Sequence, residues 1–216
     1  MTNAGPWEAV ARQGPVVRRA AAADVGALVG VLVRAFDDDP VARYLFSGDR
    51  VRARGLRRFF GIQLRSMVAG AGEVWTTSGT AGAAMWTRPG VPRQPSWREV
   101  LRLSPVLMEI VLGGRPGGGL QLLGDVEQAR PSQPHWYLAT IGTDPPRQGH
   151  GIGSALLRPV LALVDEQQMP AYLESSKWRN VPFYARHGFE VTGEIRSRDG
   201  SVSLWPMWRS PRPPGA

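Results

Sequence analysis

Residues 143–154, with the sequence TDPPRQGHGIGS, constrain this chain more than any other segment, because they lie between a predicted strand and a predicted helix. Residues 136–141 are rich in aromatic and β-branched side chains, and residues 151–168 repeat apolar side chains at helical spacing. The glycines at 149, 151 and 153 allow a sharp turn that brings backbone N–H groups close to a ligand. The start of the helix adds N–H donors and a positive dipole end, so the turn suits an anion such as a diphosphate.

A glycine-rich turn of this kind has three other interpretations. An ordinary glycine-rich turn with no ligand stays open, because short glycine motifs are weak evidence on their own. The Walker loop is excluded because it needs a Gly-Lys pair, and this turn holds no lysine. The dinucleotide fingerprint is excluded because its glycines are separated by one and then two residues early in a βαβ unit. Here the glycines alternate, in the last third of the chain.

The composition excludes several kinds of site. The chain of 216 residues has no cysteine, which excludes a disulfide framework, a thiolate zinc site and a cysteine nucleophile. Its three histidines are scattered, so we expect no metal site. The formal charge is +8, and all but one of the 26 basic residues are arginines. A basic excess favours an anionic ligand or nucleic acid; because no nucleic-acid recognition motif is present, we expect no nucleic-acid partner.

The chain is expected to be one cytoplasmic domain. The longest apolar run, residues 25–33, is much shorter than the roughly 18 residues of a membrane span. The N-terminus has no basic start followed by an apolar run, so no secretory signal is visible. We expect a flexible arm over 1–14, a single domain over 15–210 and a disordered tail over 211–216.

The order of predicted elements is that of an α/β domain. Apolar periodicity predicts helices over residues 24–36, 51–68, 99–112, 120–130, 151–168 and 181–187. Short β-prone runs predict strands over residues 16–19, 73–77, 81–87, 136–141, 171–175, 189–195 and 201–208. The glycine run at 113–119 is expected to form a flexible turn, and Pro159 is expected to kink or interrupt its helix.

Two signatures together resemble a known family. The turn has the pattern Thr-x-Pro-x-x-Gln-x-x-Gly-x-Gly from Thr143 to Gly153, and Asn180 is followed at 182–189 by PFYARHGF. Both patterns, in this order, resemble the GNAT N-acetyltransferase superfamily, most closely its puromycin N-acetyltransferase-like actinobacterial members. The resemblance implies a mixed, mostly antiparallel twisted sheet of six to seven strands flanked by helices. Residues 89–134 would then be an extra helical insert.

The resemblance implies acetyl-CoA as co-substrate and direct attack of an amine on its thioester. The N–H of Ile141 would meet the thioester oxygen, and Asn180 would contact the pantetheine arm or cap the next helix. The residues expected to hold the cofactor are Ile141, Gly142, Thr143, Arg147, Gln148, Gly149, His150, Gly151, Ile152, Gly153, Ser154 and Asn180.

Two residues are expected to be catalytic. The family motif places Tyr184 beside the sulfur, where its phenol would protonate the leaving thiolate. Glu174 is the candidate base, because burial beside Tyr172 and Leu173 would raise its pKa. A packed tyrosine and a structurally paired glutamate remain the alternatives. The acidic run at 37–39 is interpreted as a turn after a helix.

The expected acceptor is a primary amine of a small molecule, for example an aminonucleoside or an antibiotic, because the insert at 89–134 would close a pocket. The alternatives are a protein or peptide amine, a non-catalytic acetyl-CoA sensor and a basic nucleic-acid-binding module. The resemblance implies a monomer or a homodimer.

Overall fold

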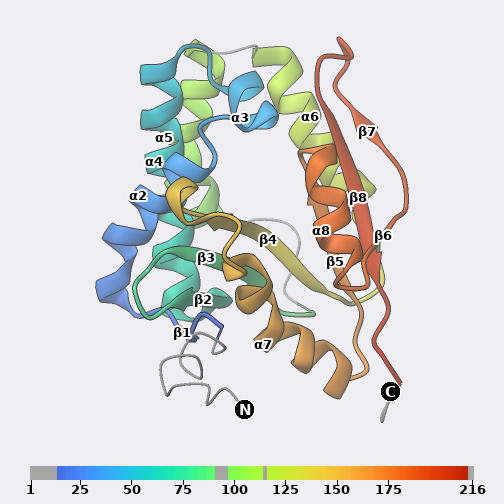
Figure 1. The fold of residues 1–216 in the computed structure, drawn as a ribbon. Coiled ribbons are helices and arrows are strands. Elements are labelled where there is room, and N and C mark those ends of the chain that lie inside the picture. The colour runs from blue at the N-terminus through green and yellow to red at the C-terminus, as the bar shows by residue number, and fades with distance from the viewer. Residues whose placement is uncertain (1–13, 91–96, 114–115, 214–216) are drawn as a thin grey trace, which may run out of the picture.

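The computed structural model describes residues 14–90, 97–113 and 116–213. Within them an eight-stranded sheet carries helices on both faces (Figure 1). The strands are β1 (Val17–Arg19), β2 (Glu73–Thr77), β3 (Gly82–Thr87), β4 (Trp136–Thr143), β5 (Ala171–Ser175), β6 (Glu190–Val191), β7 (Ile195–Arg196) and β8 (Ser203–Arg209). The helices are α2 (Val25–Ala35), α3 (Pro40–Leu45), α4 (Asp49–Ser66), α5 (Trp97–Gly113), α6 (Pro116–Ala129), α7 (Ile152–Glu166) and α8 (Val181–Ala185). Nearly all of the predicted arm and the end of the predicted tail lie outside the described residues.

The strands follow the order β1-β2-β3-β4-β5-β8-β6, and β7 pairs with β8. β4 and β5 are parallel and are joined through α7, while the other neighbours are antiparallel. The predicted mixed, mostly antiparallel sheet is therefore confirmed. It has eight strands because the predicted strand at 189–195 divides into β6 and β7.

The sheet separates two apolar cores. Helices α2, α3, α4, α5 and α6 cover one face, and α7 and α8 cover the other (Figure 1). Strand β3 shows the division, because Ala83 and Met85 belong to the first core whereas Ala84 and Trp86 belong to the second. All four side chains are fully buried, as expected for a central strand covered on both faces.

Strands β4 and β5 separate after a short paired stretch, which leaves space between them for a cavity. These strands are paired only at Trp136↔Ala171 and Tyr137↔Tyr172, whereas the pairing of β4 with β3 continues to Thr143. The register between β3 and β4 shifts at Met85 and Trp86, a bulge that bends the strand. Beyond Tyr137 one edge of β4 is therefore left without a neighbouring strand and borders a cleft.

The glycine run at 113–119 is not a turn along its whole length, contrary to the prediction. Helix α6 begins at Pro116 and includes the three glycines that follow. Proline is favoured at the first helical position, where its missing N–H has no partner to lose. A Cβ on Gly119 would lie 3.1 Å from both Ile110 and Leu45, so the small residue allows α6 to pack closely against α5 and α3.

The structure differs from the predicted helices at two further places. Helix α3, directly after the acidic run, was not predicted; Asp39 accepts hydrogen bonds from the N–H groups of Val41 (2.9 Å) and Ala42 (3.0 Å) and so caps it. Helix α7 continues through Pro159 rather than ending there. Burial of its apolar face offsets the lost hydrogen bond.

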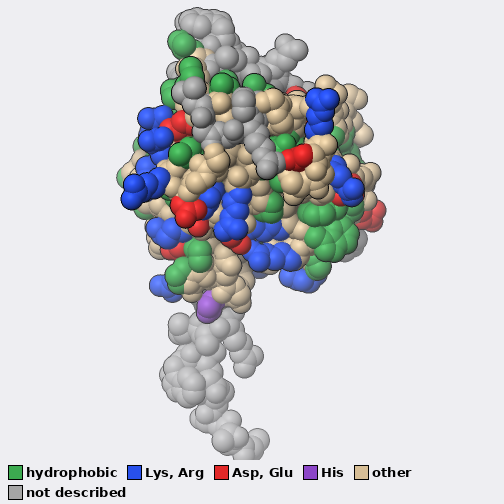
Figure 2. Space-filling view, turned by 90° about the horizontal axis from the view of Figure 1, so that it is seen from above, with side chains coloured by type: hydrophobic (Ala, Val, Ile, Leu, Met, Phe, Trp, Pro, Cys, Tyr) green, Lys and Arg blue, Asp and Glu red, His purple; other side chains and the backbone are tan. Residues whose placement is uncertain are grey.

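The described helices and the face seen in Figure 2 carry neither a membrane span nor a basic stripe. None of the helices in the described ranges is long and apolar enough to cross a membrane. On the face seen from above, Lys and Arg side chains are mixed with Asp and Glu (Figure 2). The positive charge on this face is therefore dispersed.

Candidate active site

Two left-handed glycines shape the turn after β4. A 3₁₀ turn covers Pro145–Arg147, and α7 begins at Ile152. Gly149 and Gly151 have φ angles of 79° and 74°, which residues with a Cβ adopt only at an energetic cost. Gly151 is the N-cap residue, and no side chain caps the helix. The first N–H groups of this 15-residue helix therefore have no partner within it and are available to an anion.

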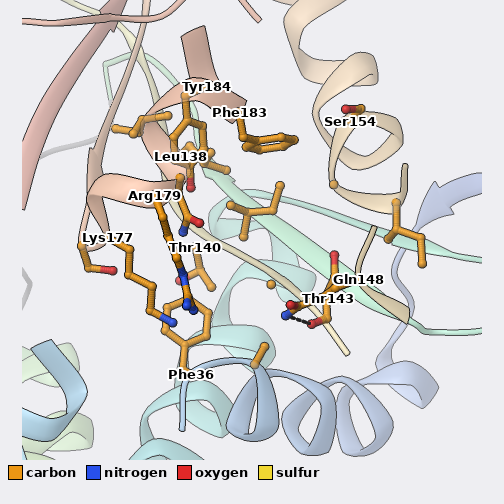
Figure 3. A pocket seen from close by; sticks show the side chains of 18 of the residues that line it. Phe36, Leu138, Thr140, Thr143, Gln148, Ser154, Lys177, Arg179, Phe183 and Tyr184 are labelled. Atoms are coloured by element: carbon orange, nitrogen blue, oxygen red, sulfur yellow. Dashed lines mark hydrogen bonds between the residues drawn. The ribbon is translucent and has the colours of Figure 1, made fainter. Parts of the chain in front are cut away.

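The turn lines a cavity of about 620 Å³, whose other walls come from the end of α2, from β4 and from the chain between β5 and α8 (Figure 3). All but one of the residues predicted for the site line this cavity: Ile141, Gly142, Thr143, Arg147, Gln148, Gly149, Gly151, Ile152, Gly153, Ser154, Glu174, Asn180 and Tyr184. The exception is His150, which lines a neighbouring open groove. Its Nδ1 lies 2.8 Å from the carbonyl oxygen of Gln148.

The backbone of β4 directs two N–H groups toward the cavity. The N–H of Asp144 donates to the carbonyl oxygen of Ala81, at 2.9 Å, and so points toward β3. N–H directions alternate along a strand, so those of Ile141 and Thr143 point away from β3. They face the edge that β5 has left, where the cavity lies.

Tyr184 points into this cavity from α8 (Figure 3). Its side chain is buried, and its ring packs edge-on against Phe183 and Phe189, at centroid distances of 5.1 Å and 6.2 Å. Burial raises the pKa of the phenol, and the negative charge of Asp39 raises it further. Tyr184 is therefore a protonated donor at neutral pH.

Glu174 also lines the cavity and accepts a hydrogen bond from a side chain of β4. Its Oε2 accepts a hydrogen bond of 2.9 Å from the hydroxyl of Tyr137. Its Oε1 is buried and has no hydrogen-bond partner among the described residues. Burial raises the pKa of Glu174, while the charge of Arg130 and the Tyr137 hydrogen bond act in the opposite direction. A buried carboxylate with a raised pKa and one unpaired oxygen has the properties of a general base.

The acidic run at 37–39 is more than a turn, because it connects two walls of the cavity. Asp38 forms ion pairs with Lys177 and with Arg179, whose Nη2 lies 2.7 Å from the carboxylate. Both cations belong to the chain between β5 and α8, and both line the cavity (Figure 3). Asp37 pairs instead with Arg52 of α4, at 3.1 Å. The ion pairs of Asp38 thus tie the α2–α3 connection to the β5–α8 connection.

Asp39 is the cavity-lining member of the acidic run. Besides capping α3, it accepts a hydrogen bond from the hydroxyl of Ser176, and its side chain is buried. The sequence offered no signal for this contact, since the two residues are 137 positions apart. Only the sheet, which brings the end of β5 beside the end of α2, makes them neighbours.

The charges of the cavity fit a phosphorylated co-substrate. Its cationic lining residues are Arg147, Lys177, Arg179 and Arg186, and its acidic ones are Asp39 and Glu174. Together with the free N–H groups of α7, the cations suit an anionic ligand such as a phosphate group. In the part of the chain that the structure describes, no three acidic or histidine side chains are grouped to hold a metal ion.

Known proteins share the sequence features of this site. A model of the acetyltransferase (GNAT) family matches residues 74–189, which include the turn, Glu174 and Tyr184. An uncharacterized N-acetyltransferase of Schizosaccharomyces pombe, C550.08, is 29% identical over 206 residues, which cover 90% of this chain and 83% of that protein.

Solved structures share the fold. The structure described as histone acetyltransferase HPA2 and related acetyltransferase, from Corynebacterium glutamicum, superposes with a TM-score of 0.70 at 29% identity. It covers 94% of this chain and 100% of that one. The PaiA N-acetyltransferase of Thermoplasma acidophilum, solved with coenzyme A, has a TM-score of 0.57 at 12% identity, covering 92% and 99% of the two chains. At that identity, the PaiA comparison concerns the fold alone.

The sheet, its parted central strands and the glycine turn define an acyltransferase of mixed α/β architecture. The chain belongs to the acetyltransferase (GNAT) family, whose members use acetyl-CoA.

Proposed function

We propose that this protein transfers the acetyl group of acetyl-CoA to a primary amine of a small molecule. The observation that carries the proposal is the pair of contacts across the cavity, from Asp38 to Lys177 and Arg179. Because these contacts join two walls, they favour an enclosed acceptor over a long peptide in an open groove. Helices α5 and α6 pack against each other, and α6 reaches β7, so the insert also covers this end of the sheet.

The residues of the cavity have complementary roles in this proposal. The N–H groups of the turn hold the diphosphate, and Ile141 donates to the thioester oxygen as negative charge develops there. Glu174 takes a proton from the acceptor ammonium, which frees the nitrogen lone pair to attack the thioester carbon. As the carbon–sulfur bond breaks, Tyr184 donates its proton to the thiolate. The attacking nitrogen then loses a second proton, which restores the phenol.

The finer proposal is an acceptor resembling an aminonucleoside or an amine antibiotic. Its support is the likeness of the segments 136–142, 148–155, 170–176 and 179–184 to puromycin N-acetyltransferase-like proteins. These segments surround the thioester position rather than the acceptor. Puromycin is therefore a first compound to test within a wider amine panel.

A protein amine is the second candidate. The observation that favours it is the Corynebacterium relative, which is described as a histone acetyltransferase and a related acetyltransferase. An acceptor of this kind would have to enter past the Asp38 contacts, either as a flexible chain end or after the contacts open.

An acetyl-CoA-dependent thiol-release assay distinguishes the candidates. The panel comprises puromycin, linear polyamines and histone-tail peptides, with the acetylated products identified by mass spectrometry. We expect release with at least one small amine and none above background with the peptides. Release with the peptides alone would reject the small-molecule proposal, and no release with any amine would favour an acetyl-CoA sensor.

A further inference from the structure

The helical insert reaches the candidate base through a buried polar cluster outside the cofactor-binding turn. Arg130, directly after α6, lies with its guanidinium carbon 3.9 Å from the ring centroid of Tyr137 on β4. Tyr137 in turn donates its hydroxyl to Glu174 on β5, at 2.9 Å. Three elements that are separate in the sequence thus form one chain of contacts, which ends at a carboxylate on the cavity wall.

Arg130 is largely shielded from water. Its side chain is 16% exposed and forms an ion pair with Glu127, at 3.3 Å. Its Nε is buried and has no hydrogen-bond partner among the described residues. Holding a guanidinium in such a place costs desolvation energy, which its contacts with Tyr137 and nearby carboxylates offset.

The groups that face Glu174 have opposing effects on its charge. Burial raises its pKa, and Glu127 raises it further because like charges repel. Arg130 lowers the pKa of Glu174 by its positive charge and Tyr137 lowers it by its hydrogen bond, while Tyr172 acts in the same direction. On the cavity side the same wall includes Asp39 and Lys177, each of which is paired with a residue of another segment. Among the groups that act on Glu174, Arg130 supplies the positive charge.

We propose that Arg130 is a positioning residue for acetyl transfer, which holds Tyr137 against Glu174 and keeps the Glu174 carboxylate charged for removal of the acceptor's proton. This inference rests on the proposed function, in which Glu174 is the base. It gives the insert a second role besides covering the acceptor end of the sheet, because α6 ends where its arginine can act on the base.

The test compares three variants by the pH dependence of kcat/KM for the amine. In Arg130→Met the acid limb should move to higher pH by about one unit, since loss of a nearby cation raises the pKa of a carboxylate. In Arg130→Lys the charge is kept and most of the shift should disappear. Arg57→Met removes an exposed arginine of α4 and should leave the profile unchanged. The KM for acetyl-CoA should stay within twofold of wild type in all three.

An unchanged acid limb in Arg130→Met, with normal folding, would overturn the inference. Should Arg130→Met not fold, Tyr137→Phe provides the same test, because it keeps the ring beneath the guanidinium and removes the hydrogen bond to Glu174. The acid limb should again move upward, and an unchanged limb would count equally against the inference.

A second readout does not depend on turnover. The carboxyl carbon of Glu174, labelled with ¹³C and assigned through Glu174→Gln, reports its titration in solution by NMR. An upward shift in Arg130→Met supports the coupling even if no amine is acetylated, an outcome in which only the proposed function fails. Titration at the same pH in Arg130→Met and wild type rejects the coupling, whatever the activity.

Discussion

Tyr184 and Asp39 line the same cavity, and the negative charge of Asp39 adds to burial in raising the pKa of the Tyr184 phenol. Asp39 is itself fixed, because it caps α3 and accepts the hydroxyl of Ser176. The arrangement keeps a proton on the phenol at neutral pH, as a group that must protonate a thiolate requires.

Tyr184→Phe should lower kcat by about 10²- to 10⁴-fold, the usual contribution of a general acid. The ring remains, so its packing with Phe183 and Phe189 and the free energy of unfolding should change little. Steady-state kinetics and calorimetric binding of acetyl-CoA are the measurements. A variant that retains wild-type kcat would show that Tyr184 serves only to pack against Phe183 and Phe189.

Glu174 should give the rate an acid limb at a pH above the ordinary titration range of glutamate, which is near 4.3. The sign follows from burial, which raises the pKa: the base is protonated and inactive below that pKa, and kcat/KM rises as the pH increases through it. Glu174→Gln should remove this limb and lower the rate by about 10²- to 10⁴-fold. A pH profile identical in Glu174→Gln and wild type would assign the base to another group.

Asp38→Asn should affect the acceptor more than the fold. The Asp38 and Arg179 side chains are 50% and 69% exposed, so their ion pair should contribute less than about 1 kcal/mol to stability. The connection across the cavity should loosen, and the KM for the amine should rise several-fold. Glu190→Gln, an exposed charge change on β6, is the matched control. Equal KM values for the amine in the two variants would show that the Asp38 contacts do not affect acceptor binding.

Gly82→Ala should destabilise the fold by about 1–3 kcal/mol through overpacking. A Cβ there would lie 2.7 Å from the carbonyl oxygen of Gly142 and 3.1 Å from the side chain of Leu156, and backbone atoms on a central strand cannot move aside easily. Gly26→Ala, in α2, meets nothing within 4 Å and should be neutral or slightly stabilising. Chemical denaturation measures both. Equal stabilities would contradict the close approach of β3 and β4.

Local patterns predicted the elements that local chemistry decides. The predicted strands at 73–77 and 171–175 have the observed bounds of β2 and β5, because each is a short run of β-prone residues between turn residues. The glycine run after α5 was misjudged, because glycine disfavours a helix unless tight packing requires it, as it does beside Ile110 and Leu45.

The candidate active site also combines features that follow from local sequence with features that depend on packing. The turn residues are consecutive, so their grouping at one cavity could be predicted. The contacts of Asp39 and Arg130 depend on how the sheet and the insert are packed. His150 lies outside the cavity, and the motif does not specify its contact with Gln148.

We propose that the N–H groups of the turn hold acetyl-CoA so that its thioester lies beside Tyr184. Isothermal titration calorimetry of acetyl-CoA tests it with wild type, Gly151→Ala and Gly200→Ala. Both glycines have positive φ angles, 74° and 70°, but Gly200 lies in the turn between β7 and β8, so the second variant controls for backbone strain alone. The account predicts one binding site per chain, with affinity lowered at least tenfold in Gly151→Ala and unchanged in Gly200→Ala. No heat of binding to wild type, or equal affinities in all three proteins, would contradict it.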